Sequence, residues 1–117
     1  MIAAMRIAVQ RRYDFEAAHT LPWHTGKCSR PHGHSYRLEV RVEGPLDQRG
    51  VVMEFDELDS LVEGQVIERL DHTDLNAILP NPTAENVALW VAEQLADLPW
   101  SVIQLWETAA GSVRIER

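Results

Sequence analysis

The stretch from His32 to Glu43 constrains the fold more than any other part of the chain, because apolar and charged side chains alternate along it. The apolar residues of one parity are Tyr36, Leu38, Val40 and Val42, and the charged residues of the other are Arg37, Glu39, Arg41 and Glu43. A period of two predicts a β-strand with one face in a core and the other in solvent. His32 and His34 share the parity of the apolar residues, so the pattern points both imidazoles inward.

Hydrophobic spacing and turn residues predict the other elements. We expect a strand from Arg6 to Glu16, a loop from Ala17 to Pro31, a helix from Phe55 to Leu70, a second helix from about Thr83 to Leu98, and strands from Val102 to Thr108 and from Val113 to Glu116. Asp56 is a candidate N-cap of the first helix, and Asn81 or Thr83 of the second. The order β-β-α-α-β-β predicts one domain over 1–117 of the α+β class, an antiparallel four-stranded sheet with two helices on one face.

Composition limits the classes of function. The formal charge of −7 over 117 residues argues against a nucleic-acid surface, and no apolar run is long enough to span a membrane. The single cysteine cannot form an internal disulfide, so we expect a cytoplasmic protein. Unpaired sheet edges in so small a domain favour a homo-oligomer. The true start is either Met1 or Met5.

His19, His32 and His34 are candidate metal ligands. Two histidines two apart on a strand present their imidazoles to the same side, and His19 would complete a set of three. Three histidines are typical of a zinc site that keeps an open coordination position for catalysis. His24 we expect on the loop surface. The competing interpretation is that each histidine is satisfied by local hydrogen bonds.

Cys28, the only thiol, has three interpretations: an inert buried side chain, a fourth zinc ligand that closes the site, or a base or nucleophile beside the metal. Lys27 and Arg30 are close in sequence and favour a thiolate. Asp71-His72 is a second candidate, in which the acid orients the imidazole and His72 passes a proton to or from Cys28. Glu107 shares the parity of Ile103 and Leu105, so it could be an inward-facing, buried carboxylate. The alternative is that the end of the strand frays and leaves the carboxylate in water.

Five short motifs occur in an order and at spacings that resemble those of one known family. They are Phe15-x-Ala-Ala-His19, Cys28-x-x-x-His32-Gly-His34, Leu70-Asp71-His72-x-x-Leu75-Asn76, Pro82-Thr83-x-Glu85-Asn86-Val87-Ala88 and Glu107-Thr108. The set resembles the 6-pyruvoyltetrahydropterin and 6-carboxytetrahydropterin synthases and extends over nearly the whole chain.

The resemblance implies a tunnelling fold (T-fold), in which trimers close a barrel and stack into a homohexamer with active sites at subunit contacts. It places Zn²⁺ on His19, His32 and His34, the catalytic thiol on Cys28 and the proton relay on Asp71 and His72. It also implies that Glu107 anchors the pterin ring and that Thr83 and Thr108 contact the substrate.

Within the family, three residues between Cys28 and His32 resemble the bacterial 6-carboxytetrahydropterin synthases of the queuosine pathway. The implied activity is a lyase that converts 7,8-dihydroneopterin triphosphate to 6-carboxy-5,6,7,8-tetrahydropterin, releasing acetaldehyde and triphosphate. Two alternatives remain open: a 6-pyruvoyltetrahydropterin synthase, and a non-catalytic, zinc-stabilised pterin-binding module with Cys28 as a fourth ligand.

Overall fold

The computed structural model describes residues 5–117, so the choice between Met1 and Met5 as the start lies outside the described residues. The strands are β1 (Ala8–His19), β2 (His32–Glu43), β3 (Thr73–Asp74), β4 (Trp100–Thr108) and β5 (Gly111–Glu116). The helical segments are α1 (Phe55–Val62), η2 (Glu63–Ile67), α2 (Glu68–Leu70) and α3 (Ala84–Gln94), with short 3-10 turns η1 (Lys27–Ser29) and η3 (Leu75–Ala77).

The sheet has the order β3-β1-β2-β4-β5. Its four long strands are antiparallel, which confirms the predicted class. The prediction of four strands was incomplete, because β3 pairs in parallel with Ala17 and Ala18 of β1 and makes the sheet mixed. A two-residue strand is too short to show a periodic pattern.

The first strand extends three residues beyond its predicted end, and this changes the setting of His19. β1 continues through Ala17 and Ala18 to His19, where a loop had been expected. In the β1–β2 ladder His19 lies directly opposite His32. His19 therefore belongs to the sheet, and the loop that carries Cys28 begins only after it.

The helices are less regular than the sequence predicts. The expected helix from Phe55 to Leu70 is interrupted by the π-helical segment η2, which contains Gly64. Its N-cap is Glu54, without a side-chain cap, rather than Asp56. The cap of α3 is Thr83, whose Oγ1 accepts a hydrogen bond from Asn86 N at 3.1 Å, and α3 ends at Gln94, before the predicted Leu98.

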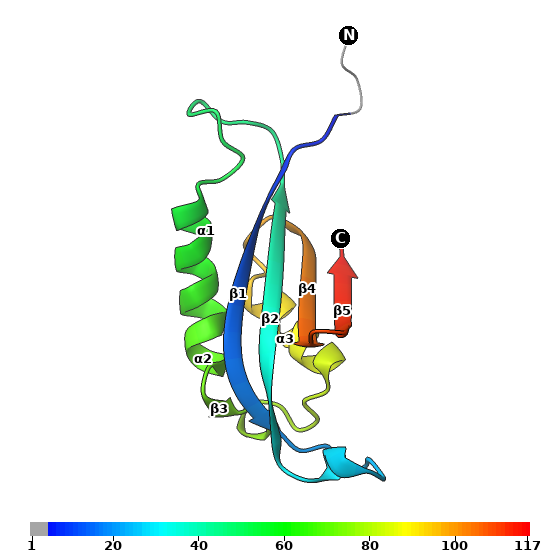
Figure 1. Ribbon diagram of the computed structural model, residues 1–117. Helices are drawn as coiled ribbons and strands as arrows, with labels where there is room; N and C mark the ends of the chain where they lie inside the picture. The colour runs from blue at the N-terminus through cyan, green and yellow to red at the C-terminus, as the bar shows by residue number, and fades with distance from the viewer. Residues whose placement is uncertain (1–4) are drawn as a thin grey trace.

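One face of the sheet packs on the helices and forms the core. Tyr36, Leu38, Val40 and Val42 are at most 1% exposed, as the parity of β2 predicts. Figure 1 shows α1 and α2 alongside β1 and α3 behind the middle of the sheet, while the loop after β1 projects beyond the sheet's end. None of the helices in residues 5–117 has the length and apolar character needed to cross a membrane.

Candidate functional site

Three histidines converge where β1 and β2 meet the projecting loop. Nitrogen atoms of His19, His32 and His34 all lie within 4.8 Å of one another. The Nε2 atoms of all three are buried and have no hydrogen-bond partner among residues 5–117. Unpaired buried polar atoms are uncommon, and three that converge are explained if they share a ligand. The residues therefore fit a metal ion, as the sequence predicted.

Backbone carbonyls orient two of these imidazoles. His19 Nδ1 donates to the carbonyl oxygen of Pro82 at 2.8 Å, and His32 Nδ1 donates to that of Arg30 at 2.7 Å. With the proton on Nδ1, each Nε2 presents a lone pair to the common centre. Burial lowers the pKa of His34 below its ordinary value, against the opposing effect of Glu107. The neutral form that a metal requires is therefore favoured.

Cys28 is not one of the grouped candidate ligands in residues 5–117. It is half-buried in the turn η1, and the cluster of candidate ligands consists of the three histidines alone. Its carbonyl oxygen accepts a hydrogen bond from Leu21 N at 2.8 Å, which closes the loop after β1. Within residues 5–117, the arrangement thus resembles an open three-histidine site more than a closed four-ligand one.

Asp71 and His72 form a pair at the edge of the sheet. Asp71 Oδ1 is 3.0 Å from His72 Nδ1 and also accepts a hydrogen bond from Glu16 N at 2.9 Å. These contacts, with that to the Glu16 amide the largest, lower the pKa of Asp71 and keep it ionised. His72 has a φ of 60°, an uncommon backbone conformation for a residue other than glycine, and its side chain is 79% exposed.

The structure does not bring the pair to Cys28 within one chain. Among residues 5–117, no hydrogen bond joins the Cys28 side chain to Asp71 or His72. His72 instead lines a shallow groove with His34 and Gly33 at the ends of β1 and β2. The predicted relay between His72 and Cys28 remains a prediction.

Glu107 lies beside the histidines. Its Oε1 is 3.6 Å from His34 Nε2, and its side chain is 29% exposed. The carboxylate thus faces the inner side of the sheet, as the parity of β4 predicts, and it helps burial to raise the pKa of Tyr36. A carboxylate in this position can accept N–H groups from a ligand that reaches the metal.

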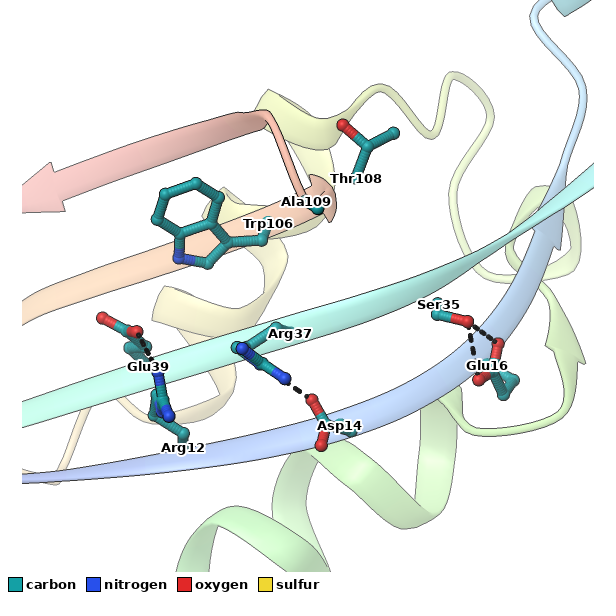
Figure 2. Close-up of a pocket in the computed structure, with 9 residues that line it drawn as sticks. All are labelled: Arg12, Asp14, Glu16, Ser35, Arg37, Glu39, Trp106, Thr108 and Ala109. Atoms are coloured by element: carbon teal, nitrogen blue, oxygen red, sulfur yellow. Dashed lines mark hydrogen bonds and ion pairs between the residues drawn. The ribbon is translucent and has the colours of Figure 1, made fainter.

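Thr83 and Thr108 both have structural roles. Thr83 caps α3, and Thr108 Oγ1 accepts hydrogen bonds from Ala110 N and Gly111 N in the turn before β5. Thr108 lines a hollow on the outer face of the sheet, where Figure 2 shows Arg37 paired with Asp14 across β1 and β2. Their predicted contacts with substrate remain predictions.

Sequence reasoning missed the groups that hold the histidines. The carbonyl oxygens of Pro82 and Arg30 leave no side-chain signal in a sequence. Asn76 also escaped a role, although it belongs to one of the quoted motifs. Its carboxamide forms two hydrogen bonds with the backbone of Thr20, the residue after His19.

The sheet and the three convergent histidines at the loop end of its first hairpin define a candidate metal-binding protein of the α+β class. Comparison with known proteins gives the family. The family model described as 6-pyruvoyl tetrahydropterin synthase matches residues 8–117. The chain belongs to this family.

Relatives within the family have different names. A Pyrococcus furiosus protein named dihydroneopterin monophosphate aldolase is 39% identical, covering 96% of this chain and 99% of its own length. A Synechocystis protein named 6-carboxy-5,6,7,8-tetrahydropterin synthase is 38% identical, covering 76% and 74%. The Caenorhabditis elegans 6-pyruvoyl tetrahydropterin synthase structure superposes with a TM-score of 0.86 at 24% identity, covering 100% of this chain and 99% of that one, which shows the shared fold.

Proposed function

We propose that the protein is a zinc-dependent lyase that converts 7,8-dihydroneopterin triphosphate to 6-carboxy-5,6,7,8-tetrahydropterin. One water is consumed, and acetaldehyde and triphosphate are released. The observation that carries the proposal is the convergence of three buried, unpaired imidazole nitrogens in a cluster that leaves Cys28 outside. The short spacing from Cys28 to His32 and the 6-carboxytetrahydropterin synthase from Synechocystis support this branch of the family.

The residues have separate roles in this reaction. Zinc held by His19, His32 and His34 would supply Lewis acidity, which would ease removal of protons from carbons of the substrate side chain. Cys28, as thiolate, takes such a proton, and Glu107 holds the pterin by accepting its amino and ring N–H groups. Asp71 orients His72, which exchanges the proton with the thiol. Thr83 and Thr108 donate hydrogen bonds from their hydroxyl groups to the substrate.

The relay requires a second copy of the chain. His72 is exposed and makes no hydrogen bond to Cys28 within one chain, so a neighbouring subunit is proposed to bring it there. This agrees with the homohexamer that the family resemblance implies. The exposed apolar residues Ile7, Leu46 and Phe55 lie around one further hollow that such contacts could cover. A cytoplasmic location is part of the same proposal.

The Pyrococcus furiosus relative supports a second candidate, cleavage of dihydroneopterin monophosphate. A retro-aldol cleavage of that compound between the first and second side-chain carbons gives a hydroxymethyl pterin and glycolaldehyde phosphate. His19, His32 and His34 would hold the metal, which would supply Lewis acidity, and a base from the chain would take the proton of a side-chain hydroxyl. The two candidates differ in the phosphate ester that is accepted and in the two-carbon fragment that is lost.

Product analysis tests these functions. The zinc-loaded protein is incubated separately with the triphosphate and the monophosphate, and mass spectrometry identifies the products. We expect 6-carboxytetrahydropterin and acetaldehyde from the triphosphate. A pyruvoyl product that keeps all three side-chain carbons would refute the leading proposal, and a hydroxymethyl product from the monophosphate alone would establish the second candidate.

The Cys28→Ala variant separates an enzyme from a zinc-stabilised module. Turnover should be lost while zinc content stays near one ion per chain, because Cys28 lies outside the cluster. Thiol labelling gives an independent measurement. A Cys28 that is protected from labelling until zinc is chelated, together with zinc loss in the alanine variant, would support the closed module instead.

A further inference from the structure

The segment from Asp71 to Asp74, which follows α2, forms hydrogen bonds with the end of β1 over more residues than β3 alone contains. Asp71 Oδ1 accepts from Glu16 N, and His72 N donates to the Glu16 carbonyl oxygen at 2.6 Å. Thr73 and Asp74 then pair with Ala17 and Ala18. The hydrogen bonds of Asp71 and His72 to Glu16 therefore lengthen the two-residue pairing of β3 with β1 at its N-terminal end.

Asn76 forms hydrogen bonds with the backbone just beyond the C-terminal end of β1. Its Oδ1 accepts a hydrogen bond from Thr20 N at 2.8 Å, and its Nδ2 donates to the Thr20 carbonyl oxygen at 3.0 Å. One carboxamide thereby supplies the acceptor and the donor that a neighbouring strand would supply to Thr20. Asn76 is itself fixed, because its backbone N donates to Asp74 Oδ1 at 3.0 Å and the adjacent Leu75 is fully buried.

Thr20 occupies the point where the strand becomes the loop. The residue before it is the candidate ligand His19, and the residue after it, Leu21, donates its N–H to the Cys28 carbonyl oxygen at 2.8 Å. A displacement of the Thr20 backbone would therefore move an imidazole on one side and the thiol-bearing loop on the other. Metal sites need their ligands held within about 0.5 Å of the productive geometry.

We propose that Asn76 is a positioning residue of the metal site, whose carboxamide fixes Thr20 and through it both His19 and the loop that carries Cys28. Its significance for catalysis rests on the proposed function. Its effects on metal affinity and on thiol accessibility do not, because neither needs a pterin to be measured.

Three variants test the proposal. Asn76→Ala removes both hydrogen bonds to Thr20, whereas Asn76→Asp keeps the acceptor for Thr20 N and removes the donor. Val66→Ala is the stability control, because Val66 is fully buried in η2 and takes no part in the two hydrogen bonds to Thr20. Zinc affinity is measured by competition with a chromophoric chelator, and Cys28 accessibility by its rate of reaction with iodoacetamide in the zinc-loaded protein.

We expect Asn76→Ala to bind zinc about 10-fold more weakly, in the range found for partners that orient metal ligands, and to react faster at Cys28. Asn76→Asp should be intermediate in both measurements, and Val66→Ala should lower the melting temperature while leaving both near wild type. Wild-type zinc affinity and thiol reactivity in both Asn76 variants, or equal changes in Val66→Ala, would overturn the proposal.

The outcome is separable from that of the proposed function. If wild-type protein turns over neither pterin phosphate but the Asn76 variants still lose zinc affinity, the positioning role stands without the enzyme. If turnover is observed and zinc affinity does not depend on Asn76, the enzyme stands without the positioning role.

Discussion

Replacement of His34 by leucine should have opposite effects on thermal stability in the metal-free and the metal-bound protein. In the part of the chain that the structure describes, His34 Nε2 is buried without a hydrogen-bond partner, and Glu107 Oε1 lies 3.6 Å from it. Leaving such an atom unpaired costs about 1–3 kcal/mol. In the presence of a chelator, His34→Leu should therefore melt at the same temperature as wild type or higher.

Zinc should reverse this order. At a free zinc concentration about 100 times Kd, binding adds about 2.7 kcal/mol to the free energy of unfolding. For a chain of 117 residues the entropy of unfolding is about 250 cal/mol/K, so wild type should gain about 11 °C. His34→Leu loses one of the three candidate ligands and should gain only a small fraction of that shift.

Differential scanning calorimetry at fixed protein concentration, with and without zinc, measures both effects. His24→Ala is the control, because His24 lies outside the cluster and its Nδ1 accepts a hydrogen bond from Gly26 N. It should keep the full zinc shift. A full shift in His34→Leu, or a shift lost equally in His24→Ala, would contradict the assignment of the ligands.

Two further predictions follow from the carboxylates. Glu107→Gln should leave zinc content unchanged and raise KM for the pterin about 10-fold or more, because an amide replaces one acceptor with a donor; zinc loss by metal analysis would instead make Glu107 a ligand. Hydrogen bonds from Arg11 first, and then from Tyr13, lower the pKa of Asp59, so its contribution to stability is present above its ordinary pKa of 3.8 and is lost as pH falls further. Melting temperature plotted against pH should decline less steeply below about pH 4 in Asp59→Asn than in wild type, and parallel curves would refute this.

Strand parity explains why much of the site could be predicted. His32 and His34 are directed inward by the same alternation that buries Tyr36 and Leu38, and Glu107 follows from the parity of β4. Period-two alternation is a local property of the backbone, so a single strand displays it without knowledge of its neighbours. The resemblance of five motifs then indicated the family, which the match over residues 8–117 confirms.

Other features depend on segments that are distant in sequence. The bond from His19 to Pro82 spans 63 residues, and the pair of bonds between Thr20 and Asn76 spans 56. The two-residue strand β3 and the π-helical segment η2 also leave no periodic signal. None of these contacts produces a pattern that spacing alone reveals.

The sequence by itself determined the α+β class, the inward histidines of β2 and the family, because each follows from local alternation or from ordered motifs. Only the tertiary structure decided that His19 lies opposite His32, that Cys28 is not among the grouped ligands of residues 5–117, and that Asn76 forms hydrogen bonds with Thr20. The physical reason is that hydrogen bonds between distant backbone and side-chain groups orient these residues, and such bonds exist only after the chain has folded.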